Sequence, residues 1–489
     1  MARCRASFLV LAIMGALAGC DGGGGGTDAG TGADSGDVSD AGTDSGPGDA
    51  GVRYDPPASL DDCFAEGFDV WTPPLDVPAY TMADRGRVVQ CAEGGTISAS
   101  DLDMRARMRG YDGPALTSGA VVTHVLYRSE HESGEGAWAS GTLYLPEAGA
   151  TDAPLLVHAS GTTGFGEQCA PSRGSFTDLE RTLWVLLGMG QPTFVPDMIG
   201  LGTPGPFAWL EPYDAGHSML DGARAALSIA GDALSGEVAL SGHSAGGHAA
   251  LSAQALQRDY APDLDVLGVN AIASVWFDTA QFGLLVSQPN YPNSTPDPAD
   301  SYWNVIYGAM YFVGHTSAYE GEDHAWDPIA AGVRDQVRTA FEANCLTNPD
   351  GTSIHSALRP IAGTVSAMFD ANLQMSFVNY QFTSVADETV MRWVERFAAD
   401  RPTLDPMGAP ITFHQGTMDN RSTLELMTCP IRETMAADAR TTACIYTDVN
   451  HNVIAGEAAA WTVEWTRALA AGTAPPACID TTTPLPTCD

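Results

Sequence analysis

The sequence of 489 residues contains no lysine, and all 23 of its basic residues are arginines. Against 60 acidic residues, this leaves a formal net charge of −37 at pH 7. Nucleic acids and anionic lipid headgroups bind basic surfaces, so a chain this acidic is a poor partner for either. We therefore expect no nucleic-acid partner, although the acidity does not identify a substrate. Contact with a membrane is expected only through the N-terminus.

Long apolar runs are also scarce, and the clearest one is too short to span a bilayer. It covers Phe8–Leu17 and follows two arginines, which is the pattern of a signal peptide over residues 1–19. The segment Leu17-Ala18-Gly19-Cys20 resembles the bacterial lipobox, in which the cysteine becomes the lipidated N-terminus. Residues 20–52 are rich in Gly and Asp and predict a flexible tether. The sequence thus predicts an exported protein, lipid-anchored at Cys20 to the periplasmic or surface face of the cell envelope.

No two cysteines have the Cys-x-x-Cys spacing, which argues against the common zinc and dithiol redox motifs. Two of the ten cysteines lie in or directly after the signal peptide, and the other eight form an even set, as in exported proteins with disulfides. Eight cysteines allow 105 pairings, so the connectivity stays open. Proximity along the chain favours Cys63–Cys91, Cys429–Cys444 and Cys478–Cys488, which leaves Cys169–Cys345.

The rest of the chain alternates between strand-like and helix-like segments. Residues 53–118 are rich in Pro and Gly and predict an irregular N-terminal extension. Strands are expected at 120–127, 136–145, 154–159, 193–197, 237–241, 265–272, 410–416 and 443–447. Helices are expected at 178–187, 215–229, 247–257, from 422, and at 457–471. Near-continuous apolar strands separated by helices are typical of an α/β fold with a mainly parallel sheet covered on both faces.

The alternation stops over residues 275–406, which are rich in aromatic residues and contain helical stretches at 329–341 and 387–397. A segment of this size between two sheet strands predicts a helical cap or lid. The core would then comprise residues 119–274 and 407–473, followed by a disulfide-bearing tail at 474–489.

One five-residue motif indicates which chemistry the protein performs. Gly242-His243-Ser244-Ala245-Gly246 lies between an apolar strand and an alanine-rich helix. This is the Gly-x-Ser-x-Gly nucleophile elbow, in which a strained strand-to-helix turn exposes the serine hydroxyl. Glycines on either side allow the tight turn and the close packing around it. Ser244 is therefore predicted to be a nucleophile.

A serine hydroxyl needs a base to take its proton and an acid to orient that base. In α/β-hydrolases the acid follows the serine and the histidine comes last. Asp419 follows the strand at 410–416, and His451 follows the last strand, so we predict these two residues as acid and base. Asp448 competes as the acid but lies too close to His451 along the chain. His248, one helical turn after Ser244, is expected to be structural.

The oxyanion of a tetrahedral intermediate needs two hydrogen-bond donors. One is expected to be the backbone amide of Ala245, directly after the nucleophile. The other should come from the loop after the strand at 154–159, where Thr162 is our choice. His243, inside the elbow, should point away from the serine by simple alternation.

A family resemblance extends these motifs over residues 120–471. The segment Ser160–Ser172, with its Cys-Ala-Pro-Ser block, resembles the oxyanion segment of the secretory lipase family, which includes fungal lipase A-type enzymes and bacterial relatives. Asp197–Pro206 and Gln415–Asp419 resemble its further landmarks. The resemblance implies an α/β-hydrolase core, a helical cap acting as a lid, no metal or organic cofactor, and ester hydrolysis. The sequence departs from the family in having Ser160 where His is usual and Asn450 where Gly often precedes the histidine.

The predicted function is a serine carboxylic-ester hydrolase (lipase or esterase) that acts through an acyl-enzyme. An exopeptidase or acyltransferase on the same fold, and a catalytically dead surface-binding lipoprotein, remain alternatives. Aromatic residues of the cap would suit an acyl chain or, equally, form the core of the cap. These residues are Trp276, Phe277, Tyr302, Trp303, Tyr307, Tyr311 and Phe312.

Overall fold

The computed structural model describes residues 56–149, 152–276, 279–292, 301–347, 352–478 and 485–488. The predicted signal peptide, the lipidation site at Cys20 and the whole predicted tether lie outside these ranges, as does Phe277. Within the described ranges, no helix combines the length and hydropathy needed to cross a bilayer.

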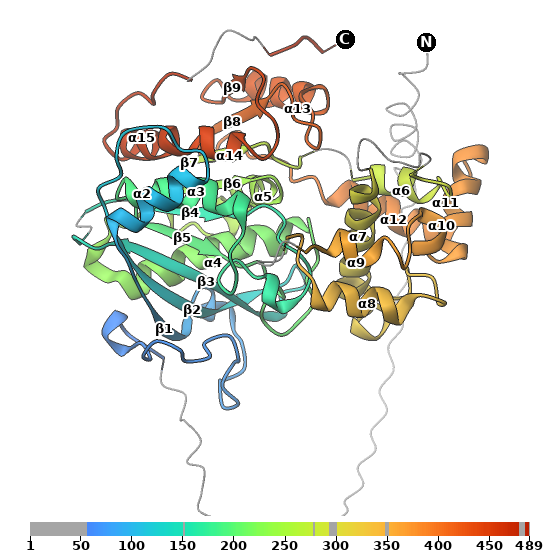
Figure 1. Cartoon of the computed structure of the whole chain (residues 1–489), viewed down its shortest axis with the longest axis horizontal. Coiled ribbons are helices and arrows are strands. Elements are labelled where there is room, and N and C mark those ends of the chain that lie inside the picture. Colours follow the sequence, from blue (N-terminus) through green and yellow to red (C-terminus); the bar gives the residue numbers. More distant parts are fainter. Residues whose placement is uncertain are drawn as a thin grey trace, which may run out of the picture. The chain divides into compact units, whose positions relative to one another are not determined.

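A single nine-stranded sheet organises the core (Figure 1). Its order is β1-β2-β3-β5-β4-β6-β7-β8-β9, antiparallel from β1 to β5 and parallel from β5 to β9. The predicted α/β class with a mainly parallel sheet is confirmed. The strands are β1 (Val88–Ile97), β2 (Ala120–Glu130), β3 (Gly136–Pro146), β4 (Leu155–Ala159), β5 (Thr193–Pro196), β6 (Glu237–His243), β7 (Asp265–Ile272), β8 (Ile411–Gly416) and β9 (Thr442–Tyr446).

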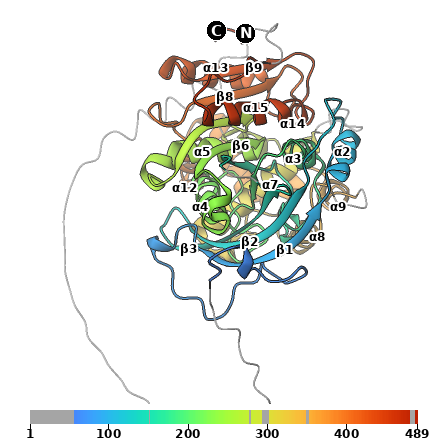
Figure 2. The same cartoon turned by 90° about the vertical axis from the view of Figure 1, so that its left-hand side faces the viewer.

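Helices cover both faces of this sheet, because its central strands are apolar on both sides. Figure 2 shows α4 and α5 on one face and α2 and α3 on the other. The face of α4 and α5 also receives α13, and the opposite face receives α14 and α15. These helices are α2 (Ala99–Met108), α3 (Thr177–Gly188), α4 (Pro212–Ala230), α5 (Ala245–Tyr260), α13 (Leu424–Ala437), α14 (Ile454–Glu457) and α15 (Ala459–Ala470).

The N-terminal extension differs from the prediction, because it contains a ten-residue strand and a helix. Strand β1 pairs with β2, but its register shifts between Val88 and Gln90 and again between Glu93 and Thr96. These irregularities and two adjacent glycines disrupt the alternation by which strands are recognised. Helix α2 follows directly and is capped by Ser98, whose hydroxyl accepts from the amide of Asp101.

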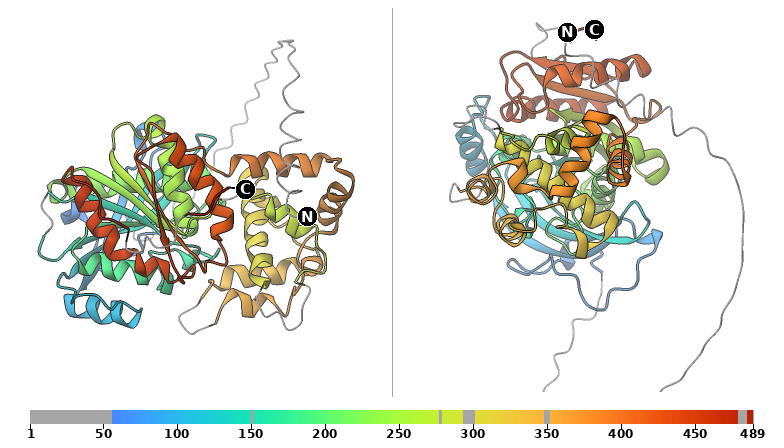
Figure 3. Two further views of the ribbon diagram at one scale, coloured as in Figure 1. Left: turned by 90° about the horizontal axis from the view of Figure 1, so that it is seen from above. Right: turned by 90° about the vertical axis from the view of Figure 1, so that its right-hand side faces the viewer.

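The cap is the chain between β7 and β8, as the fold class predicted. It lies beside the sheet in two perpendicular views (Figures 1 and 3). Its interior is aromatic: Phe312 contacts Trp393 at 4.5 Å between ring centroids, and this cluster continues into the core beneath α2 and α3. Its helices are α6 (Gln281–Val286), α7 (Tyr302–Glu320), α8 (Arg334–Ala343), α9 (Ile354–Leu358), α10 (Val365–Met368), α11 (Ala371–Thr383) and α12 (Glu388–Ala399).

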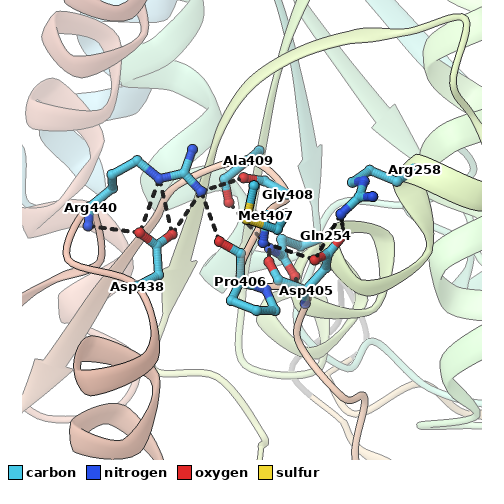
Figure 4. Close-up of polar contacts among 9 residues, drawn as sticks. All are labelled: Gln254, Arg258, Asp405, Pro406, Met407, Gly408, Ala409, Asp438 and Arg440. Atoms are coloured by element: carbon cyan, nitrogen blue, oxygen red, sulfur yellow. Dashed lines mark hydrogen bonds and ion pairs between the residues drawn. The ribbon is translucent and has the colours of Figure 1, made fainter.

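The linker that returns from the cap to β8 is held from two sides (Figure 4). Gln254 of α5 donates to the carbonyl oxygen of Asp405 at 2.7 Å and accepts from its amide at 3.0 Å. Arg258 forms an ion pair with the Asp405 carboxylate at 2.9 Å. From the other side, Arg440 donates to the carbonyl oxygen of Gly408 at 2.8 Å. These contacts fix the path of the linker against the core.

Four disulfides join segments of the described chain. Cys63–Cys91 forms, as its proximity along the chain favoured. Cys169–Cys345, the expected remaining pair, forms as well. The other two expected pairs are wrong, because the bonds are Cys429–Cys488 and Cys444–Cys478. Cys429 lies in α13 on one face of the sheet, whereas Cys444 points into the cluster under α15 on the opposite face. Residues 15 apart in sequence are thus separated by the sheet itself.

Candidate active site

The predicted elbow is a strained turn between β6 and α5. Ser244 has φ 58° and ψ −119°, a backbone region that non-glycine residues rarely occupy. A Cβ atom on Gly242 would lie 2.0 Å from the carbonyl oxygen of Gly246, and one on Gly246 would lie 2.1 Å from that of Ala159. A side chain at either position would clash with the backbone, so both positions require glycine. The turn is held in place because the Ser244 amide donates to the carbonyl oxygen of Ile272 at 2.9 Å.

The structure brings together the three residues predicted as nucleophile, base and acid. His451 Nε2 lies 2.9 Å from the hydroxyl oxygen of Ser244, and its Nδ1 lies 2.8 Å from Asp419 Oδ2. Asp419 and His451 are 5% and 3% exposed, while Ser244 is partly exposed. These residues come from the ends of three parallel strands, β6, β8 and β9, whose carboxyl ends share one edge of the sheet.

The Asp419 carboxylate is oriented by further donors. Its Oδ1 accepts from the backbone amides of Arg421 and Ser422, both at 2.9 Å. Its Oδ2 accepts from Gln415 Nε2 at 3.2 Å, beside His451. Asp448, the competing acid, is exposed and contributes its backbone amide to the hydroxyl of Thr417. The acid that contacts the histidine is thus the one after β8.

The elbow histidine has a contact that alternation along the strand did not predict. His243 Nε2 donates to the backbone carbonyl oxygen of His451 at 2.8 Å, and the two rings are 4.9 Å apart. Burial lowers the pKa of His243 well below its ordinary value, and the nearby His451 acts in the same direction. His243 is therefore a neutral side chain that supports the loop of the predicted base. His248 is structural as predicted, since its Nδ1 bonds the carbonyl oxygen of Val275 at 3.1 Å.

The predicted oxyanion loop lies against the elbow. A Cβ atom on Gly161 would be 3.4 Å from the Ser244 Cβ atom. Trp209 Nε1 donates to the Thr162 hydroxyl at 3.0 Å, and the carbonyl oxygen of Thr163 accepts from Leu346 of the cap at 2.8 Å. The Cys169–Cys345 disulfide fastens the same loop to the cap.

The second predicted donor, Ala245, begins α5, where the first amides of a helix have no intrahelical partner.

A cavity of about 700 Å³ opens beside Ser244 and His451, between the core and the cap. Its lining includes the loop at 160–163, apolar residues of α6 and several polar side chains. Two arginines and one aspartate are among them: Arg181, Arg421 and Asp178. A site of this size suits a small molecule of moderate length.

The aromatic residues expected in the cap divide between two roles. Trp303 and Tyr307 line the cavity, whereas Tyr302, Tyr311 and Phe312 are fully buried in the cap. Trp276 is also buried, stacks on Phe413 and lines a separate hollow near the linker. The cavity wall includes other aromatic residues that the sequence did not single out, namely Phe176, Trp209, Phe282 and Tyr291.

The parallel sheet, the strand–turn–helix elbow and the helical insertion after β7 define an α/β-hydrolase. Within that class, residues 168–280 match the family described as secretory lipase. This part of the chain is therefore similar to the secretory lipases, as the blocks around Cys169 and Ser244 predicted.

Individual relatives are more distant. A "probable inactive lipase" of Mycobacterium tuberculosis is 32% identical over 162 residues, covering 30% of this chain and 35% of that protein. The chain thus spans about a third of that relative. Candida antarctica lipase A in its closed state aligns with a TM-score of 0.57 and 17% identity, over 84% of this chain and 87% of its own. A rice cell wall degrading esterase from Xanthomonas oryzae aligns with a TM-score of 0.58 and 15% identity, over 79% and 97%.

Proposed function

We propose that the protein is a serine hydrolase of carboxylic esters, with Ser244, His451 and Asp419 as its catalytic residues. The observation that carries this proposal is the continuous contact from the Ser244 hydroxyl through both ring nitrogens of His451 to Asp419. In that geometry Nδ1 carries a proton toward Asp419, which leaves Nε2 free to accept the proton of the serine.

The reaction proceeds in two halves. The Ser244 oxygen attacks the ester carbonyl carbon while its proton moves to His451 Nε2. The backbone amides of Ala245 and Thr162 donate to the developing oxyanion. When the carbon–oxygen bond to the alcohol breaks, the alcohol leaves with the proton from His451. Water then attacks the acyl-enzyme with His451 again as the base, which releases the acid and restores the serine.

The experiment is a comparison of wild type and Ser244→Ala on p-nitrophenyl esters of increasing acyl length. Loss of turnover in the variant is expected, and undiminished turnover would falsify the assignment. Triglycerides and aminoacyl anilides, assayed beside the esters, separate a lipase from an esterase and from an exopeptidase.

A second candidate, a binding protein without turnover, is favoured by one observation: the name of the mycobacterial relative marks it as inactive. Here the serine, histidine and aspartate are present and in contact, which supports an active enzyme. A fluorophosphonate probe distinguishes the two, because it reacts only with an activated serine. Labelling of wild type but not of Ser244→Ala is the expected result, and absence of labelling in both would favour the binding protein.

The protein would work outside the cytoplasm. Four disulfides indicate folding in an oxidising compartment. Anchoring at Cys20 belongs to the same proposal and rests on the sequence alone. Cys20→Ser should move the protein from the membrane fraction to the soluble fraction, and an unchanged membrane fraction would argue against a lipid anchor at this residue.

A further inference from the structure

Arg421 occupies an unusual position beside the proposed catalytic residues. Its backbone amide donates to Asp419 Oδ1, so its side chain starts from a point next to the proposed acid. The side chain then reaches the cavity that holds Ser244 and His451. The predicted acid is thus followed, two residues later, by a cation that lines the substrate cavity.

The guanidinium group is held by an aromatic wall. Its central carbon lies 5.7 Å from the ring centroid of Tyr307 and 5.9 Å from that of Trp303, and its Nη1 donates to the Tyr307 hydroxyl. Tyr307 in turn stacks on Trp209 at 5.4 Å between ring centroids. Trp209 is the residue that bonds Thr162 in the oxyanion loop. One continuous wall therefore joins Arg421 to the place where the ester carbonyl would lie.

This guanidinium has donors to spare. Of its five N–H groups, the contact with Tyr307 engages one, and among the described carboxylates none lies within ion-pair distance. Asp178 lines the same cavity but lies 3.8 Å from Arg181 instead. Burial raises the pKa of Asp178, whereas the nearby Arg181, His451 and Arg421 act in the opposite direction. The charged side chains of the wall thus carry two guanidinium groups against one carboxylate.

We propose, on the basis of the proposed function, that the substrate is an ester whose acyl or alcohol part carries a carboxylate, and that Arg421 binds this carboxylate. A planar guanidinium matches a carboxylate through two parallel hydrogen bonds, which a neutral chain end cannot form. The aromatic wall would cover the chain between the carboxylate and the ester. The cavity volume of about 700 Å³ accommodates both groups in one ligand.

The test is the preference for an anionic over a neutral ester. p-Nitrophenyl monoesters of succinate, glutarate, adipate and suberate are compared with neutral acyl esters of equal length, and the ratio of kcat/KM is measured for each pair. For at least one length, wild type should favour the anionic ester, and Arg421→Gln should lower that ratio by about 10- to 100-fold, the size of a charge-assisted hydrogen bond. Arg421→Lys keeps the positive charge but lacks the paired N–H groups of the guanidinium, so it should recover part of the preference.

Arg338→Gln is the matched control, because it makes the same change of net charge in an exposed ion pair on α8 that does not line the cavity. Its ratios should equal those of wild type. The proposal is overturned if wild type prefers the neutral ester at every length. It is also overturned if Arg421→Gln lowers kcat/KM equally for both members of each pair, since Arg421 would then only position the Asp419 loop. Turnover of the neutral esters and its loss in Ser244→Ala test the proposed function separately.

Discussion

Replacing Asp419 with Asn gives the sharpest test of the proposed catalytic residues, because the surrounding donors dictate how the amide must sit. Oδ1 of Asp419 accepts from two backbone amides, those of Arg421 and Ser422, at 2.9 Å each. An asparagine must therefore place its carbonyl oxygen at this position. Its NH₂ group then faces His451 Nδ1, which today lies 2.8 Å from Oδ2.

Facing an N–H donor, His451 Nδ1 becomes an acceptor, so the ring proton moves to Nε2. The nitrogen opposite Ser244 then cannot accept the serine proton. In other triads this exchange of tautomer lowers kcat by about 10⁴-fold, which corresponds to about 5.4 kcal/mol of activation free energy. Asp419→Asn should show a loss of this order on p-nitrophenyl esters and a matching loss of fluorophosphonate labelling rate, with little change in melting temperature.

Asp448→Asn is the control on the same side of the sheet. Asp448 is exposed and has φ 60°, a conformation that asparagine tolerates well. Its kcat should match that of wild type. If Asp419→Asn retained more than about a tenth of the wild-type kcat, or if Asp448→Asn lost as much, the assignment of the acid would be refuted.

Two further predictions concern buried groups near the site. His243→Ala removes the donor to the His451 carbonyl oxygen and should lower kcat by about tenfold, because the base is misplaced. Equal kcat values in wild type and His243→Ala would show that the contact has no role in positioning. Asp197 is buried beside Ser140 and Ser172, and burial raises its pKa to about 6. The folded state therefore holds a proton that the unfolded chain releases, and stability falls as pH rises from about 4 to 6. Asp197→Asn should gain up to about 3 kcal/mol relative to wild type across this window in urea unfolding, whereas a constant difference would contradict the shift.

The sequence identified the elements whose patterns depend on local physics. The strand at 265–272 was predicted with its observed bounds, because its sequence is mostly apolar and its second half is buried on both faces. The elbow was predicted because its two glycines leave no side chain to clash within the turn or with the neighbouring strand β4. Asp419 and His451 were then predicted because in this fold class the acid follows the serine and the histidine comes last.

Features that depend on the arrangement of the sheet were missed. Strand β1 has bulges and glycines, so its partner β2 is what makes it a strand. The pairing of Cys429 with Cys488 depends on which face of the sheet each residue occupies. In both cases the deciding contact lies far away in sequence.

The surroundings of the proposed catalytic residues were the least predictable part. His243 lies one residue before Ser244, yet its role rests on a carbonyl 208 residues later. Arg421 lies two residues after Asp419, yet its position rests on aromatic residues of the cap. Sequence motifs record the groups that perform the chemistry, because those must be of one type at one spacing. Groups that select the substrate depend on a cavity formed by two distant parts of the chain, so their test must be a change in substrate preference such as that expected for Arg421→Gln.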